Sequence, residues 1–444
     1  MNIELSYIDW YRWFAAAPLG LLAHARHYRF SNFSAVQLPG GDEFLYAVKC
    51  LFIDRERPGF FRPGNAPGTT YSEDTGFDFW WNRWAESRGG VVFFAGDHAG
   101  ALRVLPVDPA SDSRSFRGVL VAGDLRLYAG SDGVYAHDPE LRLYRLTLND
   151  GCVRLSFRAC AECGIDDRNM SLLGVNPLLY LDWFRDRGLV LKRREGAGEV
   201  EYVLPYGDRV GLRGSGSCLG DIYRPAPYPG LSSEQFVELE RAHFGDNLGI
   251  TPHLCFGSPG VSVTHPAHGE GFLGVGHSKI WNNPGTVYRD DSSIATFRHR
   301  YHLGMREHFG DCYIKHFGRG TDPQRPEGFL YLLYFYFIKA DLSRCYLSDS
   351  FLPFARKQPH GPGDRDYHFG LVFPQSMVPL GPDRLAVAMG VGDWYSVWCE
   401  FDTAEVFAAL THDTGRLDMS KYGYHLICPD PADVPVSLRV LLLP

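Results

Sequence analysis

The sequence lacks an excess of positive charge. Its 444 residues include 44 Lys and Arg against 52 Asp and Glu, which gives a formal net charge of −8. A general nucleic-acid binder needs a cationic surface to bind phosphates. The charge balance therefore argues against that class, and we expect no nucleic-acid partner.

A segment long enough to cross a membrane is also lacking. The longest apolar run, Phe329 to Ile338, is about half the length that a bilayer requires, and its content is typical of a buried strand. Near the start of the sequence, an acidic residue, Glu4, occupies the region where a secretory signal needs basic residues. We therefore expect a cytoplasmic protein without a membrane span.

Common catalytic and metal-binding motifs are absent too. There is no Gly-x-Ser-x-Gly elbow, no P-loop and no dinucleotide-binding glycine pattern. Of ten cysteines, Cys160 and Cys163 form a Cys-x-x-Cys pair without the second pair that a zinc site needs. Asp364-Arg365-Asp366 has the Asp-x-Asp form of metal-dependent glycosyltransferases, but so short a pattern is more often a solvated loop. We expect no metal and no cofactor.

Turn-forming residues and aromatic residues are abundant. The sequence has 49 glycines and 29 prolines, and 14% of its residues are aromatic. Short strand-like runs alternate with turn signals, of which Asn149-Asp150-Gly151 is the clearest hairpin. These features predict an all-β fold, either a β-propeller or a double sandwich, and the lack of a strict repeat disfavours a propeller of the WD type. The predicted strands are Phe44–Phe52, Gly90–Ala95, Val119–Ala122, Leu125–Tyr128, Leu141–Leu148, Val153–Arg158, Glu199–Leu204, Val261–Thr264, Gly271–Val275, Tyr313–His316, Phe329–Ile338, Tyr367–Phe373, Leu385–Met389 and Val397–Phe401.

Few helices are expected. Ser232–Phe244 and Thr403–Leu410 have the spacing of surface helices, and residues 4–17 fit an amphipathic helix or an edge segment. Residues 56–75, 205–230 and 317–328 are rich in Gly and Pro and predict long surface loops.

Polar residues at strand ends are the candidates for a site. Asp138, followed by Pro139 and close to Arg142, is a potential general acid, although Asp-Pro is also a routine turn into a strand. Arg168 between acidic and amide neighbours could bind phosphate or sugar hydroxyls, or form a surface salt bridge. His277 and Lys279 follow a glycine-rich strand that suits an anion, although a single strand-end histidine is more often structural.

A fourth group lies near the end of the chain. Phe373-Pro374-Gln375-Ser376 is followed by Met389-Gly390-Val391-Gly392-Asp393-Trp394-Tyr395. Two glycines allow a ligand to approach the backbone, and an acid beside two aromatic rings could hold a sugar. The same pattern also fits a β-bulge and turn.

In their order along the chain, these motifs resemble those of the β-mannoside phosphorylases and β-1,2-mannosyltransferases. The resemblance covers roughly residues 28–412. In that family a Phe-Asn-Pro-Ser strand start, a Glu-Asp-Pro-Arg acid motif, a Glu-Lys-Asn-Trp motif, a Gly-Thr-Pro turn, a Val-Gly-His-Ser strand end and a Tyr-Gly-x-x-Asp motif follow one another. The similar segments here are Phe30–Ser34, His137–Leu143, Asp167–Met170, Gly257–Pro259, Val275–Ser278 and Met389–Asp393.

The resemblance implies a five-bladed β-propeller with an inverting, metal-independent site. It implies Asp138 as the catalytic acid or base. Arg142, Arg168, His277 and Lys279 would bind the donor phosphate, and the sugar would be bound by Asn32, Asp167, Asn169, Asp393, Trp394 and Tyr395. The sequence departs from the family where His137 replaces Glu, where two residues precede Arg142, and where Arg168 and Met170 replace Lys and Trp. These departures fit a divergent transferase better than a phosphorylase, whose anion pocket should be strict.

The sequence thus predicts a glycosyltransferase that moves mannose or a related hexose from a phosphate-activated donor. Its partners would be a sugar phosphate or nucleotide sugar and a carbohydrate acceptor. Two alternatives are an inverting phosphorylase or hydrolase of β-mannosides, and a non-catalytic carbohydrate-binding or scaffold propeller. The expected domains are an N-terminal extension at 1–27, the catalytic propeller at 28–412 and a tail at 413–444 packed on it.

Overall fold

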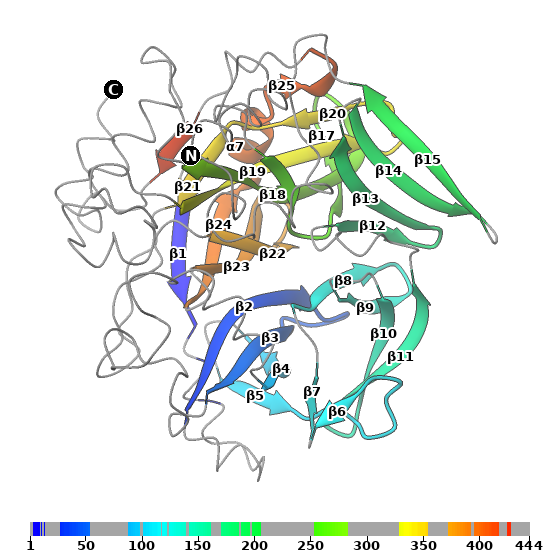
Figure 1. Ribbon diagram of the computed structural model, residues 1–444, viewed down its shortest axis with the longest axis vertical. Coiled ribbons are helices and arrows are strands. Elements are labelled where there is room, and N and C mark those ends of the chain that lie inside the picture. The colour runs from blue at the N-terminus through cyan, green and yellow to red at the C-terminus, as the bar shows by residue number, and fades with distance from the viewer. Residues whose placement is uncertain are drawn as a thin grey trace, which may run out of the picture.

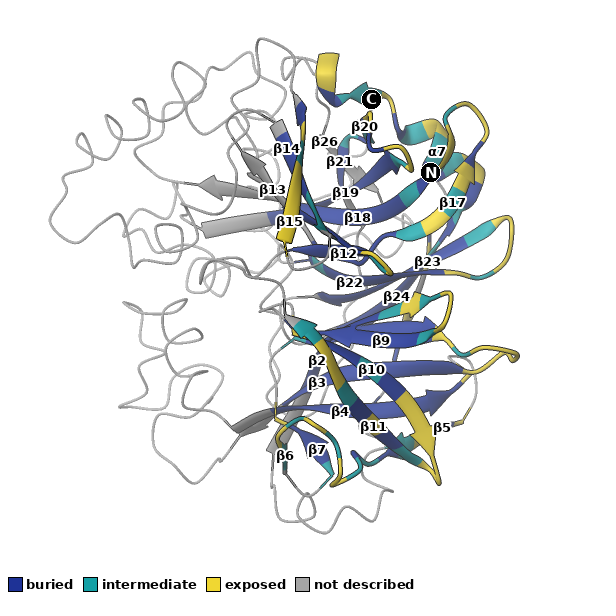
Figure 2. Ribbon diagram, turned by 90° about the vertical axis from the view of Figure 1, so that its right-hand side faces the viewer, coloured by how far each residue is buried: buried dark blue, intermediate teal, exposed yellow. Residues whose placement is uncertain are grey.

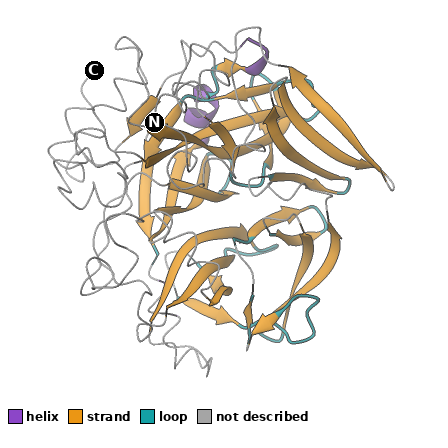
Figure 3. Cartoon of the chain, viewed as in Figure 1, coloured by secondary structure: helices purple, strands orange, loops and turns teal. Residues whose placement is uncertain are grey.

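The described residues of the computed structural model are mostly in β-strands (Figure 3). It describes residues 3–8, 10, 13, 27–53, 88–97, 101–116, 118–121, 124–138, 142–160, 170–185, 188–195, 198–205, 253–282, 328–353, 372–391, 395–416 and 424–427. Within these ranges the strands form five sheets, which are arranged as the blades of a five-bladed β-propeller (Figure 1). The fold expected from the sequence is confirmed.

The first two blades follow one another along the chain. Blade 1 contains β2 (His27–Gln37), β3 (Phe44–Ile53), β4 (Arg88–Gly96), β5 (Leu102–Leu105), β6 (Ser115–Phe116) and β7 (Val119–Leu120). Blade 2 contains β8 (Arg126–Gly130), β9 (Gly133–His137), β10 (Arg142–Asn149) and β11 (Cys152–Cys160).

Blades 3 to 5 complete the ring. Blade 3 contains β12 (Ser171–Val175), β13 (Leu178–Arg185), β14 (Gly188–Glu195) and β15 (Gly198–Pro205). Blade 4 contains β16 (His253–Phe256), β17 (Val261–His265), β18 (Gly269–Asn282), β19 (Gly328–Lys339), β20 (Cys345–Leu347), β21 (Ser350–Pro353), β25 (His412–Asp413) and β26 (Tyr424–Ile427). Blade 5 contains β22 (Val372–Pro379), β23 (Arg384–Val391), β24 (Tyr395–Asp402) and β1 (Ile3–Tyr7).

Two short helical elements follow β24. Helix α7 (Thr403–Ala409) is capped by Asp402, whose side chain accepts a hydrogen bond from the Glu405 backbone N–H. The 3-10 helix η2 (Thr414–Arg416) comes directly after β25. Helix α7 confirms the helix expected near Thr403, whereas the helix expected at Ser232–Phe244 and the strand expected at Tyr313–His316 lie outside the described residues.

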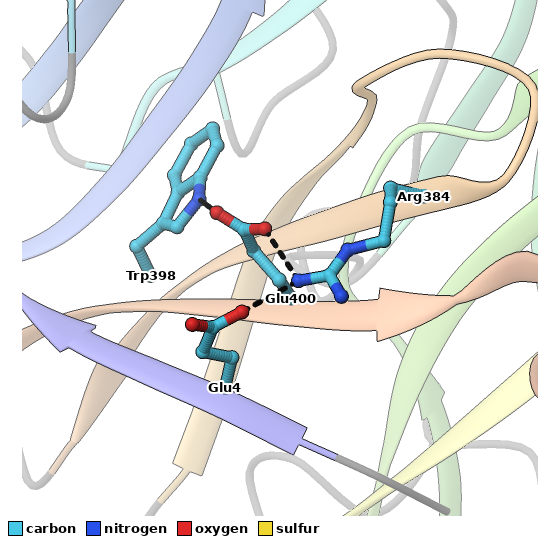
Figure 4. Close-up of polar contacts among 4 residues, drawn as sticks. All are labelled: Glu4, Arg384, Trp398 and Glu400. Atoms are coloured by element: carbon cyan, nitrogen blue, oxygen red, sulfur yellow. Dashed lines mark hydrogen bonds and ion pairs between the residues drawn. The ribbon is translucent and has the colours of Figure 1, made fainter.

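The first strand of the chain closes the ring. β1 pairs antiparallel with β24, with Ile3 opposite Phe401 and Tyr7 opposite Val397. Arg384 on β23 lies between two carboxylates, because its Nη2 is 2.7 Å from both Glu4 Oε2 and Glu400 Oε2 (Figure 4). Glu400 also accepts a hydrogen bond from Trp398 Nε1 at 3.1 Å. The edge segment expected near residue 4 is therefore the outer strand of the last blade.

Apolar side chains fill the spaces between neighbouring blades. Trp10 is buried between blades 1 and 5, where its ring lies 4.9 to 5.4 Å from the rings of Phe33, Tyr46 and Phe94. A second cluster joins blades 1 and 2, a third joins blades 2 and 3, and a fourth joins blades 3 and 4. Burial of a large ring dominates such interfaces, and truncating one costs about 3–5 kcal/mol. Exposed residues gather instead on outer strands such as β11 and β15 (Figure 2).

The first strands of the blades are tied to one another by serine hydroxyls. Ser376 Oγ in blade 5 accepts a hydrogen bond from Ala35 N in blade 1, and Ser34 Oγ in blade 1 accepts one from Leu127 N in blade 2. Both bonds are buried and 2.7 to 2.8 Å long. They fix the inner strands in place, and these strands carry the polar residues of the candidate site.

Candidate functional site

Asn32 lies at a bulge in β2, the inner strand of blade 1. The pairing with β3 shifts between Ser31 and Phe33, so Asn32 has no partner residue across the strand pair. Its side chain is buried, and its Nδ2 donates to Asp124 Oδ1 at 3.3 Å. Its Oδ1 lies against Gly390 of blade 5, and a Cβ atom on Gly390 would be only 1.6 Å from this oxygen. The bulge thus places an amide between blades 1 and 5.

Lys49 and Asp124 form a buried ion pair beside this amide. Lys49 Nζ is 3.3 Å from Asp124 Oδ1, and only 2% of the Lys49 side chain is exposed. Neither residue was predicted from the sequence to belong to a site. A single lysine inside the apolar strand β3 could have indicated a buried ion pair, because a charge is rarely buried without a partner.

Arg126 and His137 lie side by side in blade 2. They are opposite one another in the pairing of β8 with β9. Arg126 donates from Nη1 to the Met170 carbonyl in blade 3, at 2.5 Å. Burial lowers the pKa of Arg126 to about 10, against the opposing influence of the Asp124 carboxylate. Arg126 therefore stays charged near neutral pH, buried where three strands meet.

His137 is a neutral imidazole. Burial, together with the neighbouring Arg126 guanidinium, lowers the pKa of His137 to about 3. Its Nδ1 is 3.2 Å from the Asp138 carbonyl oxygen. A carbonyl oxygen only accepts hydrogen bonds, so Nδ1 carries the proton in this contact. The ring thereby holds the backbone of the residue that carries the candidate acid.

Asp138 follows β9 directly and presents a buried carboxylate. Its side chain is 5% exposed. Oδ1 accepts a hydrogen bond from the Arg142 backbone N–H at 3.0 Å, and Oδ2 accepts one from Arg142 Nε at 2.5 Å. The Asp138 backbone N–H donates to the Arg142 carbonyl, which closes the connection between β9 and β10. Since 48% of the Arg142 side chain is exposed, the carboxylate is fixed on one side by a guanidinium that solvent can reach.

This arrangement is suited to proton transfer. Hydrogen bonds from an N–H and a guanidinium favour the ionised carboxylate, whereas burial favours the protonated form. An anion that drew Arg142 away would therefore make the carboxyl group a better proton donor. In the arrangement described here, with Arg142 in contact, the carboxylate is better suited to accept a proton.

His277 lies in blade 4 and is fully buried. Its ring centroid is 4.8 Å from that of Phe373 in blade 5 and 5.2 Å from that of Tyr331. The Arg126 guanidinium carbon lies 5.6 Å from the centre of the same Phe373 ring. Phe373 therefore connects the histidine of blade 4 with the arginine of blade 2.

The glycines that precede His277 serve packing. A Cβ atom on Gly274 would lie 2.2 Å from the Tyr336 ring, and one on Gly276 would lie 2.4 Å from the Tyr334 ring. The hydroxyl groups of these tyrosines donate to the carbonyls of Ser258 and Cys255, each at 3.1 Å. In this run the glycines make room for tyrosine side chains, where the sequence had indicated an approach for an anion.

Several predicted site residues form a connected group. Asn32 contacts Asp124, the Asp124 carboxylate acts on the Arg126 guanidinium, Arg126 acts on the neutral His137, and His137 contacts the Asp138 carbonyl. His277 joins through Phe373. Lys279 and Tyr395 lie in β18 and β24, but their side chains are outside the described residues, as are the whole of Asp167, Arg168, Asn169, Asp393 and Trp394. The roles of these seven residues, like those of the other predicted site residues, stay predictions.

Among the described residues, no group of three or more His, Cys, Asp or Glu side chains is placed to hold a metal ion. None of the helices that the structure describes has the length and apolar character needed to span a membrane.

Several solved structures of carbohydrate enzymes are similar to this chain at low identity. A β-1,2-mannobiose phosphorylase from Listeria innocua has a TM-score of 0.43 and 11% identity, over 92% of this chain and 99% of that one. A mannose phosphorylase from Leishmania mexicana has a TM-score of 0.38 and 11% identity, over 89% and 91% of the two chains. A GDP-Man-dependent mannosyltransferase from the same organism has a TM-score of 0.35 and 10% identity, over 88% and 91%.

These proteins belong to the group that the motif order indicated. At such identities the likeness concerns the course of the chain and assigns it no activity. No protein-family model matches the sequence, and no curated protein matches it either.

Proposed function

We propose that this chain is a carbohydrate-active enzyme that forms a glycosidic bond, with Asp138 as the group that exchanges a proton with the reacting oxygen. The observation that carries the proposal is the buried Asp138 carboxylate, which is fixed by two hydrogen bonds from Arg142 and lies beside a neutral histidine. A fixed carboxylate with restricted access to water is the group that glycosyl transfer and glycoside cleavage both require.

In this proposal the other residues bind different parts of the donor, which are its phosphate and its sugar. Arg142 is half exposed and can reach an anionic leaving group, and His277 with Arg168 and Lys279 would complete the phosphate site. The Asp124 carboxylate lies 3.3 Å from both the Asn32 amide and the Lys49 ammonium, so the three side chains offer donors and an acceptor close together. Such a mixed set of donors and acceptors suits the hydroxyl groups of a hexose, for which mannose is the proposed sugar.

The contact between Asp138 and Arg142 supports an ionised carboxylate, which is the form that synthesis requires of a base. A hydroxyl acceptor must lose a proton as it attacks the sugar, and an ionised carboxylate held by a guanidinium is prepared to take it. Phosphorolysis and hydrolysis instead begin with a protonated acid. The second candidate, an inverting phosphorylase or hydrolase of β-mannosides, uses the same residues in reverse and therefore belongs in the same experiment.

The test is to incubate the full chain with GDP-mannose or mannose 1-phosphate and a panel of free mannosides, with and without phosphate. The assay covers both activities named for the structural neighbours. Elongated mannoside is the expected product, and Asp138→Asn should remove at least about 99% of the turnover, because acid–base catalysis contributes about 10²–10⁴-fold. Asp341→Asn, at an exposed position in blade 4, is the matched control and should keep full activity.

Three results would contradict the proposal. Full activity of Asp138→Asn would remove the assigned role of this carboxylate. Cleavage of mannosides without any synthesis would favour the second candidate. Sugar binding without turnover in any combination would favour a non-catalytic propeller.

A further inference from the structure

Gln375 is a buried amide that the site described so far does not use. It lies in β22, the first strand of blade 5, and only 1% of the residue is exposed. Neither its Oε1 nor its Nε2 has a hydrogen-bond partner among the residues that the structure describes. Burying such an amide unpaired is costly, and buried polar groups are almost always satisfied in folded proteins.

A bulge sets the position of this amide. In the pairing of β22 with β23, Pro374 lies opposite Met389 and Ser376 lies opposite Ala388, so Gln375 has no partner residue. Bulges redirect a side chain and are common beside active sites. Asn32 occupies a bulge of the same kind in β2, the strand that neighbours β22 across the interface between blades 1 and 5.

The residues on both sides of Gln375 are locked to neighbouring blades. Ser376 Oγ accepts a hydrogen bond from Ala35 N in blade 1. Pro374 packs so closely on Gly257 of blade 4 that a Cβ there would lie 2.5 Å from Pro374 Cγ. The backbone of Gln375 is thus fixed where blades 1, 4 and 5 meet, next to Phe373, whose ring contacts His277.

We propose that Gln375 binds two adjacent hydroxyl groups of the sugar, its carbonyl oxygen accepting from one and its amide N–H donating to the other. This inference rests on the proposed function. An uncharged amide whose acceptor oxygen and N–H donors both lack a partner among the described residues matches a vicinal diol, whereas a phosphate is bound more strongly by cationic donors. Gln375 would therefore contribute to the choice of sugar, while the cationic residues bind the donor phosphate.

The probe is methyl β-mannoside with its monodeoxy analogues, titrated calorimetrically into the full chain and into Gln375→Met. Methionine keeps the length of the side chain and removes both polar atoms. The variant should bind methyl β-mannoside about tenfold or more weakly, since two buried hydrogen bonds are lost. Each monodeoxy analogue that lacks one of the two neighbouring hydroxyls should bind the unmodified chain more weakly than methyl β-mannoside does. Each should also lose less affinity in the variant than methyl β-mannoside loses, because one of the two hydrogen bonds is already absent.

Thermal unfolding separates a binding role from a structural one. If the amide exists for the ligand, Gln375→Met should not lower the melting temperature of the ligand-free protein, because it removes two unpaired buried groups. Gln37→Met, at an exposed position of β2, is the matched control for binding and should leave affinity unchanged. Should Gln375→Met fail to fold, Gln375→Asn, which withdraws the amide by one methylene, is expected to show the same loss of affinity.

Different failures overturn different parts of the proposal. Equal affinity of Gln375→Met and the unmodified chain, with a lowered melting temperature, would mean that the amide is satisfied by water and structural, while the proposed function stands. A deoxy series in which no neighbouring pair of hydroxyls matters would also overturn the role of Gln375 alone. Absence of mannoside binding to the unmodified chain would overturn this inference and the proposed function together.

Discussion

The neutral state of His137 predicts that the protein loses stability in mild acid. The folded chain holds this imidazole without a proton, because burial and the Arg126 guanidinium lower its pKa from 6.5 to about 3. The unfolded chain lacks that environment and binds the proton near pH 6.5. The contribution of His137 to stability is therefore complete above pH 6.5 and is lost progressively as the pH falls toward 3.

The size of the effect follows from the shift. One pH unit between the two pKa values corresponds to about 1.4 kcal/mol, so lowering the pH from 6.5 to 4 removes about 3 kcal/mol through this one group. The whole interval, from 6.5 to about 3, corresponds to about 5 kcal/mol. Because folded proteins are stable by only about 5–15 kcal/mol, such a change is measurable in any unfolding assay.

The assay is urea unfolding between pH 4 and 7, applied to the unmodified chain and to His137→Asn. Asparagine presents an N–H near the position of His137 Nδ1, so it can still donate to the Asp138 carbonyl, but it does not titrate in this range. The variant should be less stable at pH 7, because a smaller side chain leaves a cavity. Its free energy of unfolding should fall less steeply as the pH is lowered, and the slope should be smaller by up to about one bound proton.

Tyr128→Phe is the control for destabilisation without titration. It removes the buried hydrogen bond from the Tyr128 hydroxyl to the Leu173 carbonyl in the same interface. Burial raises the pKa of Tyr128 to about 12, far above the range of the experiment. This variant should lose stability by a similar amount at every pH. If His137→Asn keeps the pH dependence of the unmodified chain, the reasoning about a buried neutral imidazole is refuted.

Two further predictions concern the closure of the ring and the position of Asn32. Arg384→Met should lower the free energy of unfolding by about 1 kcal/mol, which is the upper range for a partly exposed ion pair. It should also speed hydrogen exchange of the β1 amides. Unchanged exchange would mean that backbone pairing alone holds this strand. Gly390→Ala places a Cβ 1.6 Å from Asn32 Oδ1, so the amide must turn away; mannoside affinity should fall, and the free energy of unfolding should drop by about 1–3 kcal/mol. The control Gly41→Ala, whose Cβ would meet nothing closer than 3.8 Å, should change neither quantity. Equal mannoside affinities of the two variants would count against Asn32 as a sugar ligand.

Some strands could be predicted from the sequence because an apolar pattern lies next to a clear turn signal. The hairpin at Asn149-Asp150-Gly151 was clear, and Asp150 and Gly151 indeed adopt positive φ values of 48° and 76° between β10 and β11. The strands β12, β13 and β14 were missed. The end of β14 is charged, from Lys192 to Glu195, and lies opposite Glu199 and Glu201 in the outer strand. Such a segment has a polar pattern because its blade edge faces solvent, and local reasoning assigns it to no strand.

The site could be predicted only where one residue carries its own signal. Asp138 precedes a proline and a strand, and it is found buried at the end of β9. The importance of Asp124 and Gln375 depends on neighbours that are distant in the sequence. Asn32 and Asp124, for example, are 92 residues apart. The spacing of residues within one segment contains no information about which blades will meet.

The geometry also links the site to the closure of the propeller. Asn32 and Ala35 belong to blade 1, near the beginning of the chain, whereas Gly390 and Ser376, which contact them, belong to blade 5 near its end. These contacts form only when the last blade meets the first. β1 completes that last blade, and its pairing with β24 is reinforced by Arg384 between Glu4 and Glu400. An opening of the ring between blades 1 and 5 would therefore separate Asn32 from Gly390, so the sugar site that we propose exists only in the closed ring.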